Sequence, residues 1–210
     1  MFLGIDPTCS EAKASACAVL DGDGALAHLT VCRTDADILD LAGVWHPITV
    51  AIDSPLAFPE GMCCLEESCP CRSVHDFKGR ACEQELFRRG IPLYVTTKRS
   101  FIKPMIYRSI GLARELAARG YKVVEVYPYA AKVTLFGRPI PPKTRKEGLA
   151  FLRERLGELV PGFASHPGRV GHDLCDAVVA AHTAYLHGLG RTEAVGPPQE
   201  VSIVVPRPAA

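Results

Sequence analysis

Residues 48–53 read Ile-Thr-Val-Ala-Ile-Asp, a short and mostly apolar run that ends in an acid and is stopped by Ser54-Pro55. Such a run is typical of a strand that is buried on both faces. A similar run, Phe-Leu-Gly-Ile-Asp at 2–6, begins the chain and also ends in an acid, before Pro7. Because sheets of buried strands need helices on both faces, the two runs predict an α/β domain.

The order of the other elements predicts a mixed sheet. Strands are expected at 14–20 and 25–33, joined by the turn Asp-Gly-Asp-Gly at 21–24, and again at 122–127. A possible edge strand lies at 201–205. Helical spacing and end signals indicate helices at 35–42, 80–89, 105–119, 146–159 and 173–186. Three strands followed by alternating helices and strands favour one mixed sheet flanked by helices.

The composition is that of an ordinary globular domain. The 210 residues are 48% hydrophobic and 22% charged, with a net charge of +1, so overall charge alone does not indicate a nucleic-acid binder. No run approaches the ~20 apolar residues of a membrane span, and the N-terminus lacks a signal-peptide pattern. We expect a cytoplasmic protein with no membrane partner. The simplest organisation is one domain over 1–210, with an insertion at approximately 56–104 and a Pro-rich tail at 191–210.

Four aspartates stand where buried strands end or where the last long helix begins. Asp6 and Asp53 end two strands, and the spacing of Asp173 and Asp176 places both on one face of a helix. Converging carboxylates repel one another unless hard cations such as Mg²⁺ or Mn²⁺ lie between them. Two such ions about 3.5–4 Å apart can clamp both oxygens of a phosphodiester displacement. The alternative is that each acid only caps a turn or a helix.

The chain resembles the DUF429 group of predicted nucleases, which have an RNase H-like fold, and more distantly the RuvC-type endonucleases. The resemblance covers nearly the whole chain and rests on "GIDPT" at 4–8, "AIDSPLAFPEG" at 51–61, "ACEQELFRRGI" at 81–91, "EVYPYAAK" at 125–132 and "GHDLCDAVVAA" at 171–181. In the RuvC-like pattern, metal ligands follow the first and fourth strands and form an Asp-x-x-Asp on the final helix. The resemblance therefore implies a metal-dependent phosphodiesterase whose Mg²⁺ or Mn²⁺ is held by Asp6, Asp53, Asp173 and Asp176. At Asp53, RuvC-type enzymes use Glu.

Two further residues are candidates for the same site. Glu125, in the strand expected at 122–127, either enters the acidic pocket or pairs with a lysine at the end of the sheet. His172 either helps to activate water and orient a phosphate, or makes a structural hydrogen bond beside the start of the helix. Both alternatives are open at the level of sequence.

A basic segment suggests an anionic substrate. Residues 96–108 contain four basic side chains and no acid, and Phe101 or Tyr107 could stack on a base. A second cluster comprises Arg138, Lys143, Arg145 and Lys146. Nucleic acid, DNA or RNA, is the leading candidate, although a nucleotide would satisfy the same features and either cluster could be a solvated face. The substrate-binding candidates are Lys98, Arg99, Lys103, Tyr107 and Arg108.

The segment "MCCLEESCPCRSVHDFKGRACE" at 62–83 holds five of the nine cysteines. Cys63 or Cys64, together with Cys69, Cys71 and Cys82, gives the four thiolates of a zinc site or an iron–sulfur cluster. An iron–sulfur cluster is favoured over zinc because Cys69-x-Cys71 is too tight for paired zinc knuckles, and His75 could replace one thiolate. The sequence thus predicts a Cys-rich metal-binding insertion after the fourth strand. Two other functions fit the cysteines: a non-catalytic nucleic-acid-binding module, or a redox or transfer enzyme.

Overall fold

Seven strands form a single sheet in the order β3-β2-β1-β4-β5-β7-β6 in the computed structural model, which describes residues 1–9 and 13–208. β2 is antiparallel to β1 and β3, whereas β1, β4, β5 and β7 are parallel neighbours, and β6 is antiparallel to β7. This arrangement confirms the predicted mixed sheet. The strands are β1 (Phe2–Asp6), β2 (Ser15–Leu20), β3 (Leu26–Cys32), β4 (Thr49–Ile52), β5 (Lys122–Val126), β6 (Thr192–Val195) and β7 (Ile203–Pro206).

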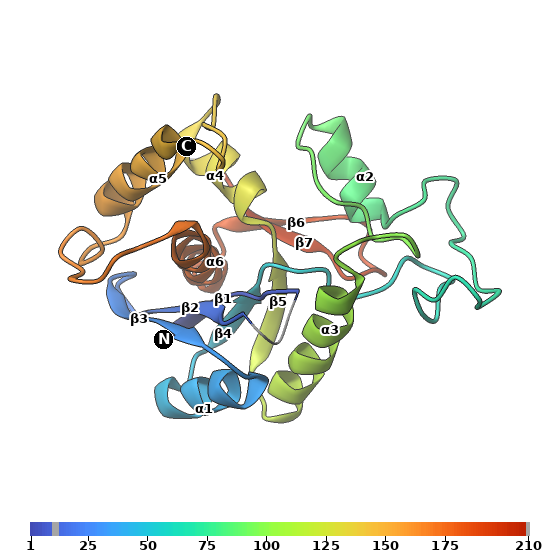
Figure 1. The fold of residues 1–210 in the computed structure, drawn as a ribbon, viewed down its shortest axis with the longest axis horizontal. Coiled ribbons are helices and arrows are strands. Elements are labelled where there is room, and N and C mark those ends of the chain that lie inside the picture. The colour runs from blue at the N-terminus through green and yellow to red at the C-terminus, as the bar shows by residue number, and fades with distance from the viewer. Residues whose placement is uncertain (10–12, 209–210) are drawn as a thin grey trace.

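Helices cover both faces of the sheet (Figure 1). They are α1 (Asp35–Trp45), α2 (Ala81–Arg88), α3 (Lys103–Ala118), α4 (Pro128–Phe136), α5 (Lys146–Leu159) and α6 (His172–Gly188). The alternation of side chains along β1 sends Leu3 and Ile5 into a core with α1 and α3, and sends Phe2 into a core with α5 and α6. No helix in the described part of the chain is both long and apolar enough to cross a membrane.

Helix α6 lies directly on β1, and a glycine permits this close approach. A Cβ atom on Gly4 would lie 2.2 Å from the carbonyl oxygen of Ala177 and 2.2 Å from the amide nitrogen of Ala181, both on α6. The absence of a side chain at Gly4 therefore lets the helix backbone rest on the strand. As a result, the first turns of α6 lie beside the carboxyl end of β1.

Two elements differ from the sequence expectation. Helix α4, which begins at Pro128 directly after the strand expected at 122–127, was not predicted. Proline is well suited to the first position of a helix because its missing N–H has no partner there in any case. The Pro-rich tail forms the β6–β7 hairpin, and β7 lies between β5 and β6 and not at the edge. The tail therefore completes the sheet.

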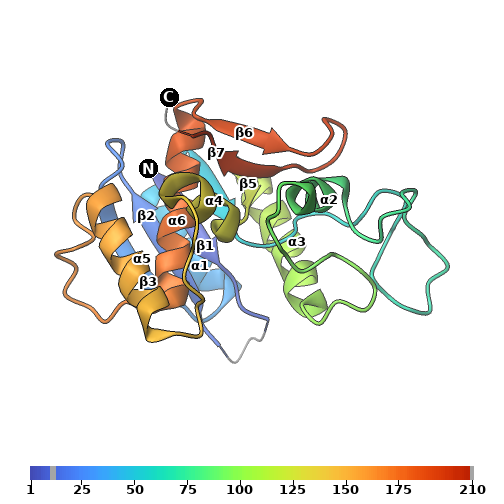
Figure 2. The same cartoon turned by 90° about the horizontal axis from the view of Figure 1, so that it is seen from above.

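The segment between β4 and α3 contains a single helix, α2. Residues 53–80, all of them described, form neither helix nor strand. Helix α2 packs against β6 and β7 through a small apolar cluster that includes Leu86, Val195 and Ile203. Figure 2 shows the loop before α2 extending outward past the sheet.

A candidate metal centre at the carboxyl ends of the strands

Three of the four predicted aspartates come together at one edge of the sheet. Asp6 ends β1, Asp53 directly follows the parallel neighbour β4, and Asp176 lies in the second turn of α6. One carboxylate oxygen from each residue lies within 4.8 Å of the other two. Because parallel neighbouring strands end at the same edge, the fold itself produces this convergence.

The proximity of these carboxylates and their burial determine how they titrate. Burial, followed by repulsion from Asp53 and Asp176, raises the pKa of Asp6 to about 9. Burial, followed by repulsion from Asp176, raises the pKa of Asp53 to about 8. At neutral pH the site therefore favours positive charge at its centre, whether protons or a cation.

Two lysines supply part of that positive charge. Lys132 of α4 is almost completely buried and donates a hydrogen bond of 2.8 Å from Nζ to Asp176 Oδ1. Lys143, in the loop before α5, forms an ion pair with the second oxygen, Asp176 Oδ2. Lys143 belongs to the second basic cluster of the sequence, whereas no role was predicted for Lys132. A lysine in the otherwise apolar stretch Tyr-Ala-Ala-Lys-Val was the available signal for a buried partner.

Asp173 and His172 lie at the beginning of α6, beside the three carboxylates. Asp173 is exposed and lies outside the group of three, although its charge contributes to the raised pKa of Asp6. The Nδ1 atom of His172 is buried and has no hydrogen-bond partner among the described residues. The structural hydrogen bond considered for His172 is therefore not present at that nitrogen.

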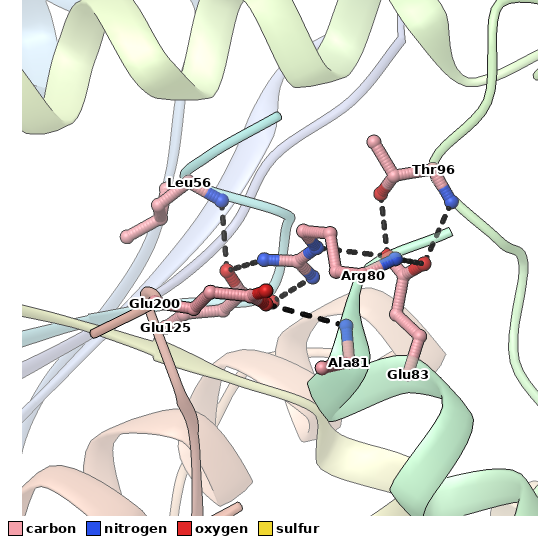
Figure 3. Close-up of polar contacts among 7 residues, drawn as sticks. All are labelled: Leu56, Arg80, Ala81, Glu83, Thr96, Glu125 and Glu200. Carbon is pink, nitrogen blue, oxygen red and sulfur yellow. Dashed lines mark hydrogen bonds and ion pairs between the residues drawn. The ribbon is translucent and has the colours of Figure 1, made fainter. Parts of the chain in front are cut away.

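Glu125 does not project into the site as a free carboxylate, and its partner is an arginine (Figure 3). Arg80 donates from Nη1 and Nη2 to the two oxygens of Glu125, at 2.6 and 2.5 Å, and the amide of Leu56 donates to Oε2 at 2.8 Å. Arg80 Nε also donates to Glu83 Oε1 at 2.9 Å. Glu125 therefore pairs with an arginine and not with the lysine considered from the sequence, although it also lines the cavity described below, and its catalytic role stays a prediction.

Glu83 has further donors of its own in this network. The backbone amide and the hydroxyl of Thr96 donate to its two oxygens, at 3.0 and 2.5 Å. Arg80, Glu83 and Glu125 are each at most 2% exposed. The result is a buried, fully paired cluster that ties the insertion to β5, next to Asp53.

The basic segment at 96–108 is largely paired within the protein. Arg99 pairs with Glu67 at 3.1 Å, Lys103 lies 3.9 Å from Glu66, and Arg108 pairs with Asp35 at 2.7 Å. Lys98 contacts the carbonyl oxygen of Cys69, and the hydroxyl of Tyr107 donates to Glu66. Acids and a carbonyl oxygen from other segments thus approach these side chains, and their binding of an anionic substrate stays a prediction.

A cavity of about 370 Å³ lies over the three carboxylates. Its other walls are mainly apolar and aromatic, and they include Leu93, Met105 and three tyrosines, Tyr94, Tyr127 and Tyr129. Tyr94 is 66% exposed, and its ring centroid lies 4.8 Å from that of Phe101, which is also exposed. Phe101 was a predicted stacking residue, whereas these three tyrosines, which come from two separate segments, were not predicted.

The structure brings together four of the five predicted cysteine ligands. The sulfurs of Cys63, Cys64, Cys69 and Cys71 all lie within 4.8 Å of one another. Cys82 is completely buried in α2, within the apolar cluster beside β6 and β7, so its assignment as a ligand is wrong. His75 pairs instead with Glu60 and Glu200, at 3.1 and 2.9 Å.

Comparison with known proteins gives a family. The sequence model of a family described as "Protein of unknown function (DUF429)" matches residues 4–201. The chain belongs to the DUF429 family. The matched range includes the three clustered aspartates and the four clustered cysteines, so both groups are part of the DUF429 region. The match confirms the resemblance to DUF429, and the mixed sheet flanked by helices is the fold class that was expected. No curated protein matches the chain.

Two solved structures of Thermus thermophilus RuvC are similar to this DUF429 protein. One is described as the RuvC structure; it is 16% identical, with 96% of this chain and 98% of that chain covered and a TM-score of 0.46. The other is RuvC in complex with a Holliday junction substrate; it is 17% identical, with 90% of this chain and 97% of that chain covered and a TM-score of 0.46.

Proposed function

We propose that this DUF429 protein is a nuclease that cleaves phosphodiester bonds of nucleic acid with Mg²⁺ or Mn²⁺ held by Asp6, Asp53 and Asp176. The observation that carries the proposal is the meeting of these carboxylates, from three different elements, on the wall of one cavity. Hard divalent cations take oxygen ligands of this kind, and a cation would relieve the repulsion among the carboxylates. A bound cation would polarise a phosphoryl oxygen and acidify a bound water.

The neighbouring residues have distinct roles in this proposal. Lys132 is buried and fixes Asp176 through the bond to Oδ1, which leaves the carboxylate oriented toward Asp6 and Asp53. Lys143 is 53% exposed and reaches from solvent to Asp176, so it can hold a phosphate oxygen of the substrate at the same place. Asp173, exposed at the start of α6, is the outer acid of the site, and His172 Nδ1, which has no hydrogen-bond partner among the described residues, offers a proton donor or acceptor next to it in the sequence.

The aromatic wall of the cavity, formed by Tyr94, Tyr127 and Tyr129, favours an unpaired nucleotide as the part of the substrate that enters. Bases stack on aromatic side chains without regard to sequence, and a paired base has no exposed face to offer. Tyr94, together with Phe101, provides such a surface at the mouth of the cavity. Single-stranded segments, or unpaired positions in branched nucleic acid, fit this wall.

The Tyr94→Ala variant is expected to bind single-stranded oligonucleotides about 5- to 100-fold more weakly, because a base–aromatic stack contributes about 1–3 kcal/mol. Tyr94→Phe keeps the ring and should bind as the wild type does. Fluorescence anisotropy of a labelled oligonucleotide in EDTA, where no cleavage is expected, measures both affinities. Equal affinity of the Ala variant and the wild type would remove Tyr94 from the binding surface.

A cleavage assay on labelled substrates tests the proposed function. The panel comprises single strands, duplexes and four-way junctions of DNA and of RNA, each incubated with Mg²⁺ or Mn²⁺ and, in parallel, with EDTA. The proposal expects cleavage of at least one substrate that contains unpaired nucleotides, and none in EDTA. Salt-sensitive binding with no cleavage of any substrate would favour the alternative of a non-catalytic binding module.

The raised carboxyl pKa values predict how Mn²⁺ binding depends on pH. With pKa values of about 9 at Asp6 and about 8 at Asp53, both groups hold protons in the neutral range, and a cation must displace them. The affinity for Mn²⁺ is therefore expected to rise from about pH 6 to about pH 9 and then to level off. Calorimetric titration in two buffers of different ionisation enthalpy measures the affinity and the released protons. A flat affinity without proton release would contradict the expected ligands.

A further inference from the structure

The loop that carries the clustered cysteines is ordered without a core of its own. Among residues 60–78, all of which are described, only Leu65 is buried, and none is in a helix or strand. Irregular segments of this length are uncommon in compact domains unless something holds them. The path of the loop is nevertheless defined, with backbone hydrogen bonds from Cys69 to Glu66 and from Val74 to Glu60. Leu65 and the partly buried Met62 pack against Ile102, Ile106 and Ile110, so hydrophobic burial anchors only this one part of the loop.

The backbone of the loop turns back on itself so that the cysteines face one another. Gly61 has a φ of +82°, and a Cβ atom there would lie 2.7 Å from the carbonyl oxygen of Arg72. This close approach places Cys63 and Cys64, just after Gly61, opposite Cys71, just before Arg72. The sulfurs of Cys63 and Cys69 lie 3.6 Å apart, which is much longer than the roughly 2.05 Å of a disulfide.

We propose that Cys63, Cys64, Cys69 and Cys71 bind one Zn²⁺ in a closed structural site. Four thiolates at about 2.3 Å from a tetrahedral zinc ion stand about 3.8 Å from one another. The observed spacing, with all four sulfurs within 4.8 Å, fits this geometry. In a cubane iron–sulfur cluster each thiolate binds a different iron atom, so the four sulfurs stand farther apart. The spacing therefore selects a single ion, against the sequence-based preference for a cluster.

Groups around the cysteines suit a thiolate site with net negative charge. Lys98 contacts the carbonyl oxygen of Cys69 and so brings a positive charge to the loop. Arg72, Lys78 and Lys98 line a hollow next to Cys71. Outer groups of this kind fix ligand orientation and offset the charge of four thiolates.

The zinc ion holds the middle of a segment whose two ends reach the cavity. Asp53, Ser54 and Pro55 line the cavity at one end of the segment, and Arg80 lines it at the other. Between these two ends, His75 pairs with Glu60 within the loop and with Glu200, which precedes β7. The proposal rests on the loop alone and holds whether or not the aspartates cleave nucleic acid.

Metal analysis of freshly purified protein tests the site. The wild type is expected to contain about one zinc per chain, and Cys69→Ser and Cys71→Ser less than about one tenth of that, because a closed site needs all four thiolates. Cys9→Ser is the matched control: Cys9 is exposed and lies outside the cluster, so this variant should keep its zinc. Wild-type protein with iron and acid-labile sulfide, or with no metal, would overturn the proposal.

A second measurement does not depend on the folding of any variant. X-ray absorption at the zinc edge of the wild-type protein is expected to show four sulfur ligands at about 2.3 Å and no nitrogen. A nitrogen neighbour would assign His75 to the metal and contradict the four-cysteine site. Loss of zinc from the two cysteine variants, together with a wild-type spectrum that shows only sulfur ligands, would support the four-cysteine site.

Discussion

Replacement of Asp53 by Asn is expected to lower metal-dependent cleavage by at least about 1,000-fold. Asp53 follows β4, and the acid on the neighbouring strand β5, Glu125, is held by Arg80 and by the amide of Leu56. A missing ligand removes several kcal/mol of charge stabilisation, and each 1.4 kcal/mol is about tenfold in rate. Steady-state cleavage of the best substrate of the panel measures the loss.

The same substitution is expected to stabilise the metal-free protein. The folded-state pKa of Asp53, about 8, lies above its ordinary value, so the folded protein binds more protons than the unfolded chain, and this group destabilises the fold increasingly as pH rises from about 4 to about 8. Asn carries no charge to repel Asp6 and Asp176. In EDTA at pH 8, Asp53→Asn should therefore melt at a higher temperature than the wild type.

The combination of lost activity and raised stability distinguishes a metal ligand from a structural residue. Asp40→Asn is the matched control, since Asp40 is exposed on α1 and lies outside the group of clustered acids, and should change neither quantity. If Asp53→Asn cleaves at the wild-type rate, the carboxylate cluster is not the reaction centre.

Arg80→Met is expected to reduce the free energy of unfolding by about 3–5 kcal/mol. The guanidinium of Arg80 satisfies both oxygens of Glu125 and one of Glu83, and all three side chains are buried. Removal of one partner of a buried ion pair leaves an uncompensated charge, which costs about that amount. Burial already raises the pKa of Glu125 against the opposing effect of Arg80, so the unpaired acid would take up a proton. Denaturant unfolding measures the change.

Two controls separate this network from surface pairs. Arg99→Met removes an ion pair from the same segment, but Arg99 is 86% exposed, so the free energy of unfolding should hardly change. The double variant Arg80→Met, Glu125→Gln should recover part of the loss, because the second change removes the orphaned charge, while Glu83 keeps its donors from Thr96. An Arg80→Met protein as stable as the wild type would show that the pairing contributes nothing.

The fold and the acidic site follow from local patterns in the chain. The apolar runs at 2–6 and 48–53 define neighbouring parallel strands, and the acid at the end of each is brought to the same edge. Helix α5 begins and ends at the predicted residues because its amphipathic spacing is regular and Pro161 follows it. Asp176 could be placed because the late helix is rich in alanine and packs closely on β1.

Partners that come from distant segments could not be predicted in this way. The basic window at 96–108 contains no acid, yet Glu66, Glu67 and Asp35 reach it from elsewhere. In the same way, the pairing of Lys132 with Asp176 and of Arg80 with Glu125 joins residues 44 and 45 positions apart. Cys82 lies close in sequence to the other cysteines, but the periodicity of α2 turns it into the core. Spacing along the chain does not fix which side chains meet when the loop between them is irregular.

The position of a bound Mn²⁺ ion tests the central claim most directly. Anomalous diffraction from crystals soaked in Mn²⁺ at about pH 8.5 is expected to show a peak among the carboxylates of Asp6, Asp53 and Asp176, with Lys143 displaced from Asp176. If no anomalous peak lies among the three carboxylates at saturating Mn²⁺, and Lys143 is still paired with Asp176, the account is contradicted.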